Sequence, residues 1–140
     1  MTIRFATPTD VPALVQLGKH MHAITLTAAL AQGKERYVCF LSEDSLGQVV
    51  GGLLAVLEKH IFSQQLTASI MHYDVMPEKR MGGYGVRLLK AFDQWCINRK
   101  VAEINFGINS AEEMQEMQRL GSFAVRMGYS KVGENYVRSI

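Results

Sequence analysis

The most informative stretch of the chain is Val75-Met-Pro-Glu-Lys-Arg-Met-Gly-Gly-Tyr-Gly-Val-Arg87. An apolar run over 66–76 predicts a strand that leads into it, and Val86, Leu89 and Phe92 recur behind it at helical spacing. Glycines let the backbone turn tightly and point several amide N–H groups at one place. The first turn of a helix adds unpaired N–H donors and a partial positive charge. The stretch therefore predicts a phosphate or diphosphate site, and a plain strand-to-helix turn is the alternative.

The remaining segments predict an α/β chain. Alternating or continuous apolar runs predict strands over 2–7, 37–41, 49–57, 66–76, 102–108, 129–132 and 136–140. Apolar residues at helical spacing predict helices over 11–31 with a break, from 86 onward, and over 110–127. This order predicts one central, mostly antiparallel sheet of about seven strands flanked by helices. The strands on either side of the second helix form a βαβ unit, and we expect them to be parallel.

Short signals mark where these elements begin and end. Pro8-Thr9-Asp10 predicts a turn that caps the first helix, and Ser110 with Glu113 has the spacing of a capping box. Gly128 predicts the end of the last helix. Gly51-Gly52, inside a strand, indicates a bulge or a close backbone approach.

Length and composition limit the class of protein. The chain has 140 residues, 48% hydrophobic and 20% charged, which predicts one soluble globular domain over 1–140. The net charge of +2 does not point to a nucleic-acid partner. No apolar run approaches the ~20 residues of a membrane span and the amino terminus lacks a signal-peptide core, so we expect no membrane partner and a cytoplasmic location. Cys39 and Cys96 lie among apolar residues and are expected to be buried free thiols, and no metal set is predicted.

The pattern Arg80-x-x-Gly83-x-Gly85 resembles the acetyl-CoA loop of the GNAT superfamily of N-acetyltransferases. Val75-x-Pro-Glu before the loop and the leucine-rich helix after it also fit that family. The opening strand and helix, and the closing stretch from Arg126 to Tyr136, resemble the two ends of the family's domain. The resemblance covers nearly the whole chain. The sequence as a whole is also similar to those of small bacteriophage-encoded members.

The resemblance implies acetyl-CoA as the cofactor. Backbone N–H groups of the loop would hold the CoA diphosphate, and Lys79 or Arg87 would meet the adenosine phosphate. The backbone of Val75 and Met76 would pair with the pantetheine arm, and an N–H there would support the developing oxyanion. The cofactor-binding residues implied in this way are Val75, Met76, Lys79, Arg80, Met81, Gly82, Gly83, Tyr84, Gly85, Arg87 and Asn109.

His72 and Asp74 are the predicted catalytic residues. An amine must be neutral to attack a thioester, so a base has to take a proton. Both residues lie on the strand before the loop and share one face under period-2 alternation. His72 falls where many family members carry a carboxylate base, and an unperturbed histidine pKa near ~6.5 suits the role. The alternative is that both side chains only line a polar site or contact the substrate.

The last helix departs from the family pattern. Many members carry a tyrosine there that protonates the leaving thiolate, and this chain has Ala124 at that position. Tyr84, Tyr129 and Tyr136 are the candidate substitutes. The resemblance implies acetyl transfer to an amine acceptor, a small molecule or a protein. The rival function is a catalytically weak or inactive CoA-binding or protein-interaction module. Homodimers are common in the family, and the sequence does not decide between monomer and dimer.

Overall fold

The computed structural model describes residues 2–17, 27, 30, 36–59, 62–107, 114–133, 136 and 138–140, and only the backbone of Met81 and of residues 114–118. The chain divides into two compact units, Met1–Asn105 and Phe106–Ile140, and each is treated by itself. A single domain over 1–140 therefore stays a prediction. In the described part of the chain, no helix has both the length and the apolar character needed to cross a membrane.

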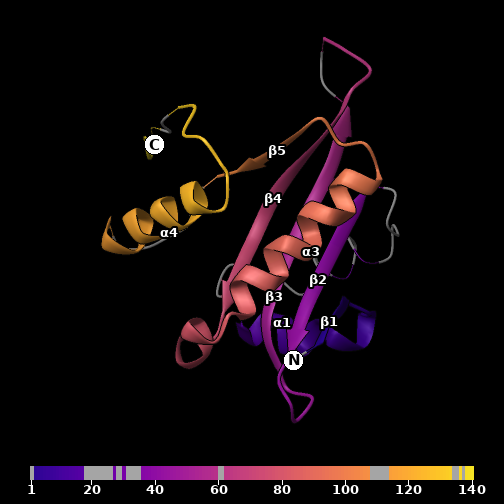
Figure 1. Cartoon of the computed structure of the whole chain (residues 1–140), viewed down its shortest axis with the longest axis vertical. Coiled ribbons are helices and arrows are strands. Elements are labelled where there is room, and N and C mark those ends of the chain that lie inside the picture. The colour runs from indigo at the N-terminus through magenta and orange to yellow at the C-terminus, as the bar shows by residue number, and fades with distance from the viewer. Residues whose placement is uncertain are drawn as a thin grey trace. The chain divides into compact units, whose positions relative to one another are not determined.

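One five-stranded sheet forms the centre of the first unit (Figure 1). Its strands, in spatial as well as chain order, are β1 (Thr2–Phe5), β2 (Tyr37–Glu43), β3 (Val49–Lys59), β4 (Leu66–Val75) and β5 (Glu103–Phe106). The first four strands pair antiparallel, which confirms the predicted meander. The N–H of Ala102 donates to the carbonyl of Leu66 at 2.9 Å and joins the beginnings of β5 and β4. Those two strands therefore run parallel, as the predicted βαβ unit requires.

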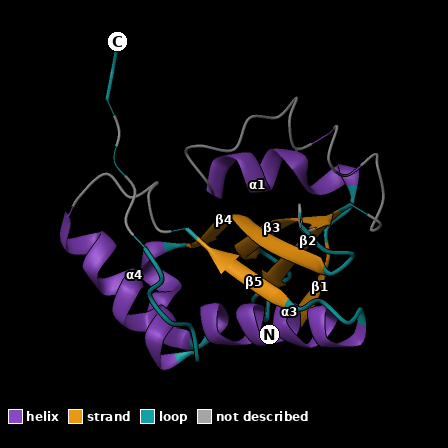
Figure 2. Cartoon of the chain, turned by 90° about the horizontal axis from the view of Figure 1, so that it is seen from above, coloured by secondary structure: helices purple, strands orange, loops and turns teal. Residues whose placement is uncertain are grey.

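Helices cover both faces of this sheet. The helical elements are the 3-10 turns η1 (Pro8–Asp10) and η2 (Pro77–Gly82) and the α-helices α1 (Val11–Leu17), α3 (Tyr84–Asn98) and α4 (Met114–Arg126). Figure 2 shows α1 and α3 on opposite sides of the sheet. Helix α3 packs on β1 to β4 and α1 packs on β3. The rest of the first predicted helix, beyond Leu17, lies outside the described residues apart from the isolated positions 27 and 30.

The apolar stripes of the two helices build the core. On the α1 side a buried cluster contains Val11, Leu14, Cys39, Leu41 and Leu54. On the other side α3 contributes fully buried side chains, which are Leu88, Leu89 and Phe92. Burial of one such side chain stabilises the fold by about 1.5–3 kcal/mol. The predicted α/β class with a mostly antiparallel sheet is therefore confirmed.

Cys39 and Cys96 are both buried free thiols, as predicted. Burial raises the pKa of each thiol to about 12, because a thiolate would lose its hydration inside the core. Neither side chain is therefore a nucleophile near neutral pH.

Gly51 and Gly52 lie where other parts of the chain approach the backbone of β3. A Cβ atom on Gly51 would come within 2.5 Å of Ser42 Oγ, and one on Gly52 within 2.8 Å of Leu14 Cδ2. The register also shifts beside Gly51, because Ser42 pairs with Gly51 while Glu43 pairs with Val49. The predicted bulge is confirmed, while the closest contacts at both glycines come from side chains and not from the backbone approach that was the alternative.

The two terminal strands predicted over 129–132 and 136–140 are wrong for the residues that the structure describes there. None of these residues lies in a strand, so the sheet has five strands and not about seven. The side chains of Val132, Tyr136 and Ile140 are almost fully exposed. Short strands need a paired backbone and one buried face, and the apolar pattern alone provides neither.

The end of α4 is the one predicted from Gly128. The N–H of Tyr129 donates to the carbonyl of Ala124 at 3.0 Å, and that of Gly128 to Val125 at 3.1 Å. Gly128 has a φ of 97°, which favours glycine, so the helix ends in a Schellman motif. The predicted capping box of Ser110 and Glu113 lies outside the described residues.

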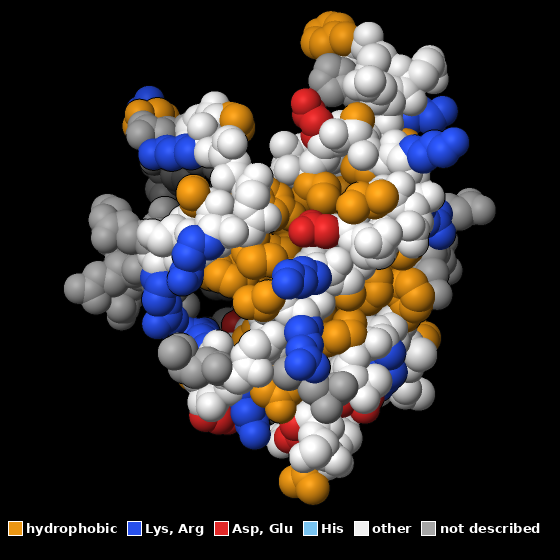
Figure 3. All heavy atoms as spheres, in the orientation of Figure 1, with side chains coloured by type: hydrophobic (Ala, Val, Ile, Leu, Met, Phe, Trp, Pro, Cys, Tyr) orange, Lys and Arg blue, Asp and Glu red, His pale blue; other side chains and the backbone are white. Residues whose placement is uncertain are grey.

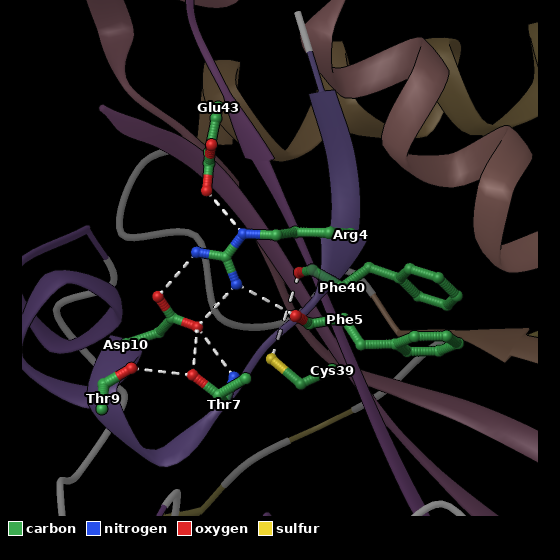
Figure 4. Close-up of polar contacts among 8 residues, drawn as sticks. All are labelled: Arg4, Phe5, Thr7, Thr9, Asp10, Cys39, Phe40 and Glu43. Atoms are coloured by element: carbon green, nitrogen blue, oxygen red, sulfur yellow. Dashed lines mark hydrogen bonds and ion pairs between the residues drawn. The ribbon is translucent and has the colours of Figure 1, made fainter. Parts of the chain in front are cut away.

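A partly buried ion-pair network fixes the start of α1 (Figure 4). The Arg4 guanidinium donates to both Asp10 carboxylate oxygens at 2.9 Å and also to Glu43. The backbone N–H of Thr7 donates to Asp10 Oδ2 at 2.7 Å. These bonds, chiefly the one from Arg4, lower the pKa of Asp10 to about 2. One arginine thus ties β1, β2 and η1 together.

We predict that Asp10→Asn lowers the free energy of unfolding at pH 7 by about 1–2 kcal/mol, a figure reduced because Arg4 is partly exposed. The folded pKa of Asp10 lies below its unfolded value of ~3.9, so its contribution is complete above about pH 4 and is lost as the pH falls toward 2. Urea denaturation at pH 7, 4 and 3 should therefore show a flatter acid dependence in the variant. Glu58→Gln, at an exposed carboxylate of β3, is the control, and equal acid sensitivity of the Asp10 variant and the wild type would contradict the assignment.

Candidate functional site

A register shift in β4 decides which way its polar side chains face. Leu54 pairs with His72 and Ala55 with Ile70, so Met71 has no residue opposite it on β3. Such a bulge changes the alternation of side chains, because a residue is added to one strand only. Met71 is 40% exposed, whereas Ile70 is buried.

Beyond the bulge, His72 and Asp74 lie on the α1 side of the sheet. Asp74 pairs with Gly52, whose missing side chain faces Leu14 of α1. His72 pairs with Leu54, a member of the apolar cluster on the same side. Residues directly opposite on neighbouring strands share a face. The prediction that His72 and Asp74 share one face is therefore confirmed, while their catalytic roles stay predictions.

The last peptide of β4 faces a part of the strand edge that β5 does not reach. The N–H of Met76 donates to the carbonyl of Val50 on β3 at 2.8 Å. In a trans peptide C=O and N–H point in opposite directions, so the Val75 carbonyl points away from β3, toward the side of β5. β5 begins beside Leu66 and has four residues, so it extends only to about the middle of β4. In the described part of the chain, no strand pairs with this edge beyond that point.

The two residues predicted to hold a pantetheine arm, Val75 and Met76, differ in which way their backbone groups point. The N–H of Met76 is already used within the sheet. The N–H and C=O of one residue in an antiparallel strand point to the same side, so both backbone groups of Val75 face the free edge. Val75 is therefore the better candidate of the two.

Gly83 lies at the turn between η2 and α3 and has a backbone conformation that favours glycine. Its φ is 81° and its ψ is 2°, and a Cβ atom there would meet nothing within 4 Å. The N–H of Arg87 donates to the Gly83 carbonyl at 3.1 Å and begins the helix. Glycine is thus required by the backbone conformation, and the space beside it is open for a ligand.

Gly85 is required for a different reason, which is packing. A Cβ atom at this position would come within 2.6 Å of the Tyr73 hydroxyl oxygen and 3.4 Å of Val75 Cγ2. Tyr73 faces α3, opposite to His72, and burial raises the pKa of its hydroxyl well above the ordinary value. The sequence analysis missed Tyr73, although period-2 alternation already placed it on the face opposite to His72 and Asp74.

The Arg80 side chain folds back onto the end of β4. Its Nε–H donates to the Val75 carbonyl oxygen at 3.1 Å, and its Nη2 lies 3.7 Å from Asp74 Oδ1. The sequence analysis did not predict this contact with the strand. No local sequence signal indicates the contact, because it depends on η2 turning back toward the strand.

The other predicted residues of the loop are arranged around this turn. Figure 3 shows basic side chains over the middle of this face, where α3 runs, and the exposed basic residues of α3 are Arg87 and Lys90. Lys79 is half-buried in η2. The ring of Tyr84 lies against Gly82, where a Cβ atom would approach Cε2 to 2.9 Å. Met81 is described by its backbone in η2, and Asn109 lies outside the described residues.

The candidate thiol acids divide between the two units. Tyr84 begins α3 in the first unit. In the second unit Ala124 is buried in α4, and Tyr129 packs edge to face on Phe106 with ring centroids 5.8 Å apart. The absence of a thiol acid at Ala124 stays a prediction. Among the described residues, no group of three or more His, Cys, Asp or Glu side chains is close enough to hold a metal ion.

Proteins similar to this chain were found among solved structures. Neither a scan against protein-family models nor a search of the curated proteins found a match. Among solved structures, a tetramutant of the BH1408 protein from Bacillus halodurans matches with a TM-score of 0.83 and 17% identity over 100% of both chains. The aminoglycoside acetyltransferase HMB0005 from an uncultured soil sample matches with a TM-score of 0.78 and 14% identity over 99% of this chain and 97% of that one. Ribosomal-protein-alanine N-acetyltransferase from Brucella melitensis biovar Abortus 2308 matches with a TM-score of 0.74 and 12% identity over 100% of both chains.

These structures share one architecture. The chain has the GNAT fold. The resemblance drawn from the loop sequence is thereby confirmed for the fold. At 12–17% identity the structural similarity identifies neither an acceptor substrate nor an activity. The chemistry therefore has to be argued from the residues.

We predict that Gly85→Ala lowers the free energy of unfolding by about 1–3 kcal/mol, because the new methyl group overlaps the Tyr73 hydroxyl. Tyr73→Phe in the same background should recover part of the loss, since the ring carbon Cζ is 3.6 Å from the Cβ position, an ordinary contact. Thermal and urea melts of both single variants and of the double variant measure the coupling.

The matched control for this pair is Gly121→Ala in α4, where a Cβ atom meets nothing within 4 Å. That change should stabilise the helix by about 0.5–1 kcal/mol. If Gly85→Ala were equally stabilising, or if Tyr73→Phe brought no recovery, the packing role of Gly85 would be wrong.

Proposed function

We propose that this protein is an acetyltransferase that moves the acetyl group of acetyl-CoA to an amine. The observation that carries the proposal is the turn from β4 through η2 to α3, in which Gly83 has a positive φ and open space beside it. The GNAT fold and the acetyltransferase names of two similar structures support it. The residues present fit a CoA thioester, because backbone donors, basic side chains and a free strand edge follow one another along this turn.

The diphosphate would lie against the N–H groups from Arg80 to Gly85, at the amino-terminal end of α3. Lys79 and Arg87 supply positive charge for the remaining phosphate. The Val75 carbonyl would accept a hydrogen bond from an amide of the pantetheine arm, and the Val75 N–H faces the same edge. When bound, acetyl-CoA supplies a thioester carbonyl that an amine can attack.

His72 would take the proton from the incoming amine. It lies on the α1 side of β4 with Asp74 two residues along, three residues before the peptide that would orient the thioester. In this proposal Asp74 contacts the cationic amine before deprotonation, and Arg80 holds its carboxylate in the free protein. The alternative for both residues is contact with the substrate without proton transfer.

The acceptor is an amine, on a small molecule or on a protein. The similar structures carry names that point to different acceptors, an aminoglycoside and a ribosomal protein, so the shared fold does not select one. The lack of a nucleic-acid or membrane partner, a cytoplasmic location and a bacteriophage origin stay predictions from the sequence, and the choice between monomer and homodimer stays open.

A second candidate function, a CoA-binding or protein-interaction module without efficient catalysis, is favoured by Ala124. Calorimetry with acetyl-CoA followed by a CoA-release assay over a panel of amines separates the two. Binding with turnover supports the enzyme, and binding without turnover of any amine supports the module. The absence of binding would overturn the proposed function itself.

We predict that Gly83→Asp weakens acetyl-CoA binding at least tenfold more than Gly83→Asn does. Both residues tolerate a positive φ and have similar size, so the pair isolates the negative charge added beside the diphosphate. Calorimetry measures the two dissociation constants, and circular dichroism checks that both variants remain folded. Equal affinities would place the diphosphate elsewhere.

We predict that His72→Ala lowers kcat by about 10²-fold or more while the dissociation constant for acetyl-CoA changes little. The reason is that His72 faces the α1 side of β4, away from α3 and the loop before it. CoA release measures kcat and calorimetry measures the affinity. An unchanged kcat would remove His72 from the mechanism.

A further inference from the structure

Arg80 engages the two groups that end β4. One nitrogen, Nε, donates to the Val75 carbonyl at 3.1 Å, and another, Nη2, lies 3.7 Å from the carboxylate of Asp74. This is possible because η2 turns back after Met76, so that residue 80 returns to a strand that ended five residues earlier. The guanidinium therefore bridges the last peptide and the last carboxylate of the strand.

The Val75 carbonyl is an acceptor that the sheet itself does not use. It points to the side of β5, and β5 extends only to about the middle of β4. A buried or half-buried carbonyl needs a donor, and the Arg80 guanidinium supplies one. Donors with a charge make stronger hydrogen bonds than neutral amides, although water weakens this one because the Arg80 side chain is 34% exposed.

We infer that Arg80 is an autoinhibitory latch. In the free protein its side chain is hydrogen-bonded to the Val75 carbonyl oxygen, and the side chain moves away when the pantetheine arm of a CoA thioester binds there. The inference rests on the proposed function, which brings the amide N–H groups of the arm to this strand edge. The guanidinium and the arm approach the same oxygen from the same side, so they compete for it.

The same movement changes the acceptor side of the sheet. While Arg80 bridges the two groups, the Asp74 carboxylate has a cation 3.7 Å away. When the donor displaces Arg80 from Val75, the guanidinium loses its shorter contact and moves away from the Asp74 carboxylate. Binding of the acetyl donor thereby removes the Arg80 charge from a carboxylate on the face that also carries His72, which favours the approach of a cationic amine.

Pantetheine is the probe that isolates this competition. It has the amide N–H groups of the arm but no phosphate, so removing the Arg80 charge takes away the competitor without removing a phosphate contact. We expect Arg80→Met to bind pantetheine roughly threefold to tenfold more tightly than the wild type. Titrations followed by NMR read dissociation constants into the millimolar range. Arg99→Met is the matched control, since Arg99 stacks on Trp95 beyond the other end of α3 and should leave pantetheine affinity unchanged.

A second measurement needs no variant that could misfold. In the wild type, the Arg80 Nε–H resonance should shift on addition of pantetheine as the bond to Val75 breaks, while that of Arg99 stays in place. Equal or weaker pantetheine binding by folded Arg80→Met, or an unmoved Arg80 resonance at saturating pantetheine, would overturn the latch. Calorimetry of the wild type with CoA separates this failure from failure of the proposed function, because in the latter case CoA itself does not bind.

Discussion

The close approach of α3 to the end of β4 is the constraint on which the site depends. Residue 85 has no side chain, so the helix can lie against the Tyr73 hydroxyl, and any larger residue would overlap that oxygen. The contact fixes where the first turn of α3 starts relative to the last residues of β4. The amide N–H groups at Gly83 and beyond therefore have a defined position beside the strand edge, and a site made of backbone donors works only if the backbone is held in this way.

Alternation along β4 gives the strand two functions, and the bulge at Met71 decides which side chains serve each. Beyond it, Tyr73 and Val75 face α3 and secure the helix, while His72 and Asp74 face α1. Because side chains alternate along the strand, one set holds the loop and the other set offers titratable groups on the opposite face. The short β5 completes the arrangement, because it leaves the Val75 carbonyl without a strand partner among the described residues.

The α1 side is held by charge as well as by apolar contacts. Arg4 on β1 reaches Asp10 in η1 and Glu43 on β2, which fixes the point from which α1 crosses the sheet. Leu14 of α1 then fills the space above Gly52, next to Asp74 on the neighbouring strand. The face that carries the predicted catalytic residues is thus built from segments far apart in the chain.

The sequence by itself determined the features that depend on near neighbours. The strand before the loop, the glycine turn, the helical stripe of α3 and the glycine end of α4 follow from spacing and from the φ that only glycine adopts easily at Gly83 and Gly128. It also indicated the GNAT fold, because Arg80, Gly83 and Gly85 stand at fixed spacing between a strand and a helix.

Tertiary structure alone decided what depends on distant residues. The bulge at Met71 arises from pairing with β3, and the contact of Arg4 with Glu43 joins residues 39 positions apart. The Arg80 contacts require η2 to turn back onto β4. The two terminal strands failed as predictions for the same reason: a strand exists only where another segment pairs with it, and an apolar pattern does not contain its partner.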